Sequence, residues 1–127
     1  MTKLKEVYKC EICGNIIEVL DAGGGKLVCC GDEMILQKEN VVDTSGEKHV
    51  PQISVQDDVL QVKVGEVDHP MTDDHYIQWI EVQLPNEILI KFLKAGQKPE
   101  AKFFLNGAEI QKVRAYCNLH GMWKNEI

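Results

Sequence analysis

The sequence predicts a mainly β protein, in which a small cysteine-rich module precedes a β-sandwich of immunoglobulin-like type. The metal-binding residue types are unevenly distributed. Four of the five cysteines lie before residue 31, whereas the fifth cysteine and all four histidines lie after residue 48. From residue 50 onward, roughly seven short runs rich in Val, Ile and aromatic residues are separated by turn residues, with little helical periodicity. We therefore expect two domains, residues 1–37 and 38–127, with the polar stretch 37–46 as the linker.

The first module is too short to be held together by a hydrophobic core alone. Residues 4–10 and 16–20 read as strands, 22–25 as a glycine turn and 26–29 as a returning strand. A piece of about 36 residues rarely buries enough apolar surface to stand alone. A structural tetrathiolate metal site contributes an apparent ~10–16 kcal/mol, so the sequence favours a metal-stabilised module.

The second domain is expected to carry its functional residues at the ends of strands. Its predicted strands are 50–55, 60–64, 76–84, 87–93, 101–105 and 110–116, with turns at 56–58 and 106–107. Loops at strand ends of such a scaffold commonly carry binding and catalytic residues.

Composition excludes several classes of partner. The net charge is −6 and there is no basic stripe, so we expect no nucleic-acid binding. No apolar run approaches the ~20 residues that span a bilayer, and the N-terminus lacks the apolar core of a secretory signal, which predicts a cytoplasmic protein without membrane contact. Cytosolic thiols stay reduced, so the five cysteines indicate metal binding or redox chemistry rather than disulfides.

The first candidate site consists of four cysteines. Cys10 and Cys13 form a C-x₂-C knuckle, and the adjacent pair Cys29 and Cys30 completes the set. Tetrahedral sulfur coordination suits zinc and iron alike. Adjacent cysteines open some of the sulfur–metal–sulfur angles, so we expect a distorted tetrahedron.

The second candidate site combines imidazoles with one thiol. His49 precedes the first strand of the sandwich, His69 and His75 share a loop, and Cys117 and His120 follow the strand predicted at 110–116. Imidazole and thiolate together suit a redox-active first-row metal, and zinc also fits.

Both sets of residues carry a family resemblance. The segments Tyr-Lys-Cys-Glu-Ile-Cys-Gly-Asn (8–15) and Leu-Val-Cys-Cys-Gly (27–31) resemble desulforedoxin modules. Four further segments resemble the catalytic domain of superoxide reductases: Glu-Lys-His-Val-Pro (47–51), His-Pro-Met (69–71), His-Tyr-Ile-Gln-Trp-Ile (75–80) and Tyr-Cys-Asn-Leu-His-Gly (116–121). The whole chain thus resembles the desulfoferrodoxin family of two-iron superoxide reductases.

The resemblance implies two iron ions per chain. One is held by the four cysteines Cys10, Cys13, Cys29 and Cys30. The other has an equatorial set of histidines and an axial thiolate: His49, His69, His75, His120 and Cys117. Glu47 is the implied sixth ligand of the ferric state, and Lys48 the implied positive charge beside the open position.

The implied activity is one-electron reduction of superoxide to hydrogen peroxide without oxygen evolution, a protection against oxidative stress. The implied electron donor is rubredoxin or a similar small redox protein. The resemblance also implies a homodimer formed through the N-terminal module.

Two other functions compete with this one. A non-catalytic electron carrier or zinc-stabilised binding protein explains the first four cysteines but leaves the histidines and Cys117 idle. A non-haem iron oxygenase typically uses two histidines and one carboxylate with several open positions, whereas four histidines and a thiolate leave one. Metal analysis discriminates the reductase from the carrier or binding protein, since two irons per chain are expected for the former and one metal or zinc for the latter.

Overall fold

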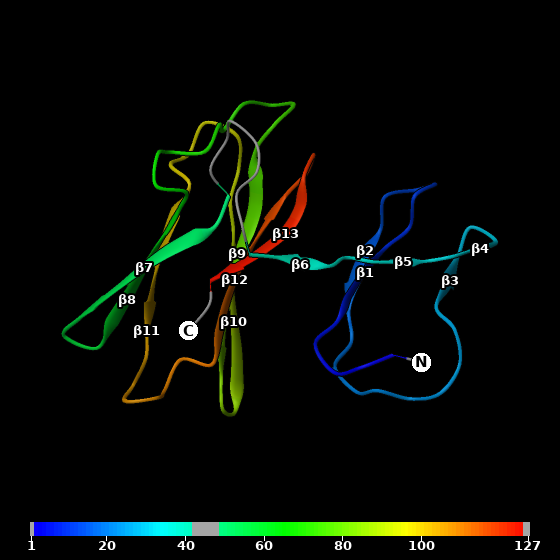
Figure 1. Cartoon of the computed structure of the whole chain (residues 1–127), viewed down its shortest axis with the longest axis horizontal. Coiled ribbons are helices and arrows are strands. Elements are labelled where there is room, and N and C mark those ends of the chain that lie inside the picture. The colour runs from blue at the N-terminus through cyan, green and yellow to red at the C-terminus, as the bar shows by residue number, and fades with distance from the viewer. Residues whose placement is uncertain (1, 42–48, 126–127) are drawn as a thin grey trace. The chain divides into compact units, whose positions relative to one another are not determined.

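The computed structural model describes residues 2–41 and 49–125, which form two compact units, Met1–Lys38 and Glu39–Ile127 (Figure 1). Every regular element among these residues is a β-strand, which confirms the predicted fold class. Across the same residues there is no helix that has the length and apolarity to cross a membrane.

The first unit is a small β-structure built around two cysteine-bearing turns. Its main sheet has the order β2-β1-β5, from strands Ile16–Glu18, Val7–Lys9 and Ile35–Leu36. A separate pair, β3 (Val28–Cys29) and β4 (Asp32–Glu33), forms the second turn. The buried apolar side chains of this unit are few, namely Val7, Cys10, Val19 and Met34. So small a core agrees with the expectation that a metal site helps to hold the unit together.

The second unit is a sandwich of two sheets. A five-stranded sheet has the order β10-β9-β12-β13-β6, and a three-stranded sheet the order β11-β8-β7. All pairings are antiparallel except that of β13 with β6. The strands are β6 (Glu39–Asn40), β7 (Pro51–Gln56), β8 (Val59–Val64), β9 (Ile77–Leu84), β10 (Glu87–Phe92), β11 (Glu100–Phe104), β12 (Lys112–Cys117) and β13 (Gly121–Asn125).

The core lies between the two sheets and ends at the histidine and cysteine residues. Alternate residues of β8, β9 and β12 point into it, as the period of a half-buried strand requires. Cys117, the last residue of β12, belongs to this core and is fully buried. The same packing that stabilises the sandwich therefore fixes the position of one candidate metal ligand.

Four strands were not predicted, namely β4 and β5 of the first unit and β6 and β13 of the second. The strand expected at 110–116 is not the last one, because Gly121–Asn125 returns beside it as β13. The linker prediction of 37–46 was wrong at Glu39–Asn40, which forms β6 along β13; residues 42–46 lie outside the described residues. β6 and β13 lack the alternating apolar pattern that marks a strand. Their strand structure comes from pairing with each other and from the pairing of β13 with β12.

Glu39 is held in β6 by a group of cations. Its carboxylate accepts hydrogen bonds from Lys112 Nζ at 2.9 Å and Arg114 at 3.1 Å, and Lys124 Nζ lies 3.7 Å away. Buried Arg114 also donates from Nε to Glu81 at 2.5 Å. Burial raises the pKa of Glu39, but Lys112 and Arg114 outweigh burial, so the pKa lies below its ordinary value of 4.5.

We expect Glu39 to stabilise the sandwich in a pH-dependent way. Because its folded-state pKa is lowered, its contribution is complete above the unfolded-state value and disappears as the pH falls below about 4.5. Glu39→Gln should lower the free energy of unfolding by about 1 kcal/mol at pH 7, since the site is partly screened by solvent, and by less at pH 4. Urea unfolding of both proteins at the two pH values measures the difference. The exposed Glu87→Gln serves as the control, and a Glu39 effect that is equal at both pH values would contradict the assignment.

Candidate metal centres

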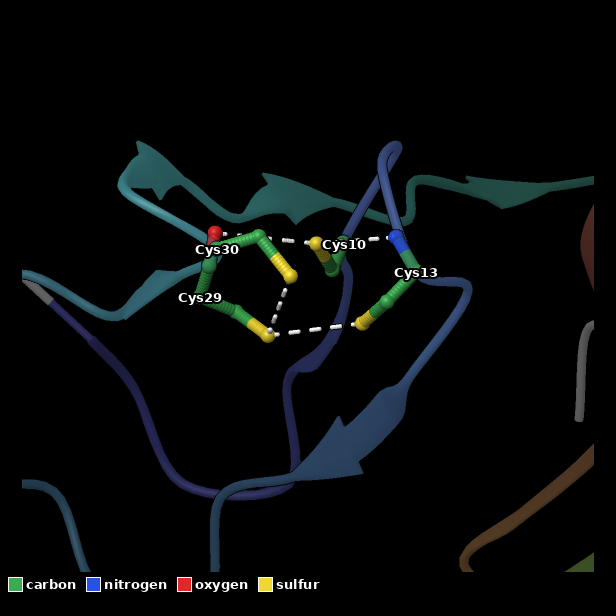
Figure 2. Close-up of side chains that lie close together, drawn as sticks. All are labelled: Cys10, Cys13, Cys29 and Cys30. Carbon is green, nitrogen blue, oxygen red and sulfur yellow. Dashed lines mark hydrogen bonds between the residues drawn. The ribbon is translucent and has the colours of Figure 1, made fainter.

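Two tight turns present the four cysteines of the first unit to one another (Figure 2). Cys10 and Cys13 lie in the turn after β1, where the amide of Gly14 donates to the carbonyl of Cys10 at 2.9 Å. Cys29 ends β3, and Cys30 leads into β4 with a positive φ of 54°. That left-handed backbone lets two consecutive cysteines face the same point.

The sulfur positions fit a single tetrahedral metal ion. Cys13 Sγ lies 3.5 Å from Cys29 Sγ, which lies 3.9 Å from Cys30 Sγ, and the four sulfurs are all within 4.8 Å of one another. A tetrahedron with metal–sulfur bonds of about 2.3 Å has sulfur–sulfur edges of about 3.8 Å. The sequence prediction that these four residues come together is confirmed in geometry, and both iron and zinc fit it.

The four thiols cannot all ionise easily without a cation. The backbone amide of Cys13 donates to Cys10 Sγ and lowers the pKa of Cys10 to about 7. The hydrogen bond between the side chains of Cys30 and Cys13 raises the pKa of Cys30 to about 12. Cys10 ionises readily, whereas neighbouring thiols resist the ionisation of Cys29 and Cys30, so a bound cation would stabilise the thiolates of this site.

The second unit brings the other candidate ligands together from four places in the chain. His49 precedes β7, His69 and His75 lie between β8 and β9, Cys117 ends β12, and His120 lies in the turn to β13. The ligand atoms of His49, His69, His75 and Cys117 are within 4.8 Å of one another. His120 adjoins them, with Nδ1 3.1 Å from His49 Nε2 and 3.9 Å from Cys117 Sγ.

The four imidazoles form a closed ring. Centroid distances are 4.6 Å from His49 to His69, 4.8 Å from His69 to His75, 5.1 Å from His75 to His120 and 5.0 Å from His120 back to His49. Neighbouring rings are tilted by 59–85°. Rings set almost edge to face around one centre can all turn a nitrogen toward it, and Cys117 Sγ is close enough to add a fifth donor. Such a donor set suits a redox-active first-row metal and leaves a six-coordinate ion one further position.

Asn118 joins the loop that carries His75 to the end of β12, where Cys117 lies. Its side-chain oxygen accepts from the amide of Tyr76 at 2.9 Å, and its side-chain nitrogen donates to the carbonyl of Asp74 at 3.0 Å. Sequence reasoning missed this residue, because an asparagine inside a turn carries no metal-binding signal of its own. Its two bonds flank His75 on both sides and so fix the loop relative to Cys117.

Asn118→Ala should weaken metal binding at the His/Cys site about tenfold, since residues that orient metal ligands typically contribute 10- to 100-fold. The measurement is the transfer of Fe²⁺ from the reduced protein to a calibrated chelator. Asn86→Ala, in the exposed turn between β9 and β10, is the control. Equal iron retention by Asn118→Ala and the control would show that the hydrogen bonds do not position the ligands.

Glu47 and Lys48, the other two predicted site residues, lie outside the described residues.

Both units match the same family of proteins. Residues 41–126 match the desulfoferrodoxin family, and residues 2–37 match the desulfoferrodoxin N-terminal domain. The chain belongs to the desulfoferrodoxin family. The resemblance inferred from the motifs is thereby confirmed, and each match contains one of the two candidate metal sites.

The chain is similar to curated desulfoferrodoxins and to solved superoxide reductases. The chain is 52% identical to a desulfoferrodoxin of Desulfarculus baarsii and 53% identical to one of Syntrophotalea carbinolica, over 99% of each protein. Among solved structures, the superoxide reductase of Treponema pallidum aligns with a TM-score of 0.82 at 29% identity, over 95% of this chain and 97% of the other. The Giardia intestinalis superoxide reductase described as 1Fe-SOR aligns with a TM-score of 0.56 at 32% identity, over 64% of this chain and 97% of the other. The tetracysteine and His/Cys donor sets are consistent with two iron sites in this member of the family.

Proposed function

We propose that the protein is a superoxide reductase, which converts superoxide to hydrogen peroxide with one electron and two protons and evolves no oxygen. The observation that carries the proposal is the closed ring of four imidazoles with the thiol of Cys117 beside it. The names of the relatives agree with it. The protein would serve as protection against oxidative stress.

His49, His69, His75, His120 and Cys117 would hold an iron ion, which would supply the electron and a binding position for superoxide. The chain itself sets the conditions for this chemistry. The imidazoles would serve as nitrogen donors to the metal, and Cys117, which is held in the apolar core, would add a thiolate that donates electron density to it. His49 and His69 are buried, so solvent water does not reach the site past these two side chains.

Glu47 and Lys48 precede His49 directly, and we assign them to the open position. Lys48 attracts the superoxide anion, which the net charge of −6 otherwise repels. Glu47 would take up that position once the electron has been transferred and would thereby keep a second superoxide from reacting there. The sequence adjacency to a ligand supports both roles.

The remaining assignments rest on the family. We propose domains at 1–37 and 38–127, with iron on Cys10, Cys13, Cys29 and Cys30 in the first. Rubredoxin or a similar small redox protein is proposed as the electron donor, and a homodimer as the assembly. A cytoplasmic location agrees with five cysteines that form no disulfide in the structure.

Reduction without dismutation is the decisive test. Rapid mixing of reduced protein with excess superoxide, without a donor, should yield one peroxide per catalytic iron and then stop, because nothing returns an electron to the protein. Peroxide and oxygen are measured together with iron content. Continued turnover, with oxygen evolved at half the superoxide consumed, would mean dismutation and would defeat the assignment. One metal per chain, or zinc alone, would instead favour an electron carrier or binding protein.

A further inference from the structure

Trp123 contacts two members of the imidazole ring from outside it. Its indole stacks on His49, with ring centroids 4.5 Å apart and planes 12° from parallel. Its Nε1 donates to the backbone carbonyl of His120 at 3.2 Å. The side chain is only 6% exposed, so both contacts are made in the protein interior.

Neither of the two histidines that Trp123 contacts lies in a strand. His49 precedes β7 and lies in no strand, and His120 lies in the turn between β12 and β13. Trp123 itself is fixed, because it pairs with Ala115 of β12 on one side and with Asn40 of β6 on the other. A rigid side chain in the middle of a sheet therefore supports two ligands that the sheet does not hold directly.

The two contacts act on different features of the site. Parallel stacking restrains the plane of the His49 imidazole, and the bond to the His120 carbonyl restrains the turn from which His120 projects. Since His49 Nε2 and His120 Nδ1 lie 3.1 Å apart, a shift of either ring changes the spacing of the donor set.

We propose that Trp123 is a positioning residue of the His/Cys metal centre, which sets the orientation of His49 and the position of His120. This role rests on the proposed function, because it presumes a metal on those histidines. Partners of this kind are usually carboxylates or carbonyls that bind the ligand's free nitrogen, whereas here one indole restrains one ligand by its face and another through the backbone.

The molecule provides a matched control. Its only other tryptophan, Trp79, also stacks on an aromatic ring, that of Tyr116, with centroids 4.6 Å apart and planes 1° from parallel. Tyr116 is not a candidate ligand. Loss of an indole from this second stack tests general packing without touching a histidine.

The experiment compares full-length Trp123→Leu, Trp123→Phe and Trp79→Phe after reconstitution with iron. Fe²⁺ transfer to a chelator gives the affinity of the His/Cys site, and the optical and spin-resonance spectra of the ferric protein report its symmetry. Trp123→Leu should weaken iron binding about tenfold and alter the ferric spectra. Trp123→Phe, which keeps a stacking ring but loses the N–H, should show a smaller loss and still a changed spectrum. Trp79→Phe should match the wild type in both.

Each alternative outcome is informative. Unchanged iron affinity and spectra in Trp123→Leu would overturn the proposal, and so would equal effects from Trp79→Phe, which would indicate packing alone. If Trp123→Leu does not fold, Trp123→Phe decides, since an unchanged spectrum there would overturn it. A wild-type protein that binds no iron at the His/Cys site would refute the proposed function itself, whereas wild-type binding with unaffected variants would refute only the role of Trp123.

Discussion

Cys117→Ser should reduce the rate of superoxide reduction by more than about 100-fold, whereas Cys13→Ser should leave it nearly unchanged when the protein is reduced beforehand. Removal of a ligand should cost more than the 10- to 100-fold typical of the partners that orient ligands. Cys117 is fully buried in the core of the second unit, while Cys13 is exposed in the first. The two substitutions are chemically identical, so each is a control for the other.

The measurement is a stopped-flow rate with reduced protein, together with iron content and separate spectra for the two sites. Cys13→Ser should lose the absorbance of the tetracysteine site alone, because the ligands of each site lie within one compact unit. If Cys13→Ser stays folded but also loses the iron of the His/Cys site, the sites are not independent. Full activity in Cys117→Ser would show that the reaction does not require the Cys117 thiolate.

The candidate ligands could be selected from the sequence because each is a rare residue type in a typical local context. The C-x₂-C knuckle at Cys10 and Cys13 predicts a shared metal by itself. For the histidines, the prediction also needed the resemblance. His49 and His120 are 71 residues apart in the sequence, and that spacing gives no sign that their side chains lie in contact. The strand pattern was clear for β8 and β9, whose apolar residues alternate or run continuously into a core.

The residues that hold the candidate ligands in place could not be predicted from the sequence in the same way. β13 has no alternating pattern, and its strand character comes from pairing with β12 and β6. Trp123 and Asn118 act through stacking and through bonds to backbone groups, which any sequence of similar composition could make or lack. Contacts of this kind depend on the register of strands, and register is set by the whole sheet rather than by local residue types.

Lys48→Ala should slow the second-order reaction with superoxide about tenfold or more and flatten its dependence on salt. A unit charge about 6 Å from the anion is worth about 0.7 kcal/mol in bulk water and about 3 kcal/mol at an effective dielectric constant of 20. A tenfold rate change corresponds to about 1.4 kcal/mol, which lies between these limits. The remaining protein is more strongly anionic after the substitution, so the steering that draws superoxide inward is weakened at long range as well.

Salt dependence separates local steering by Lys48 from a general loss of charge. Rates are measured by stopped flow from low to high ionic strength. The Debye screening length falls to about 3 Å at 1 M salt, which removes the contribution of exposed charges. Lys102→Ala, on the exposed side of β11, changes the net charge by the same amount and serves as the control. It should alter the rate only slightly, whereas the deficit of Lys48→Ala should be largest at low salt and shrink as salt rises. A wild-type rate and salt slope in Lys48→Ala, or an equal effect from Lys102→Ala, would show that Lys48 is an ordinary solvated lysine and that the anion is attracted by the metal centre alone.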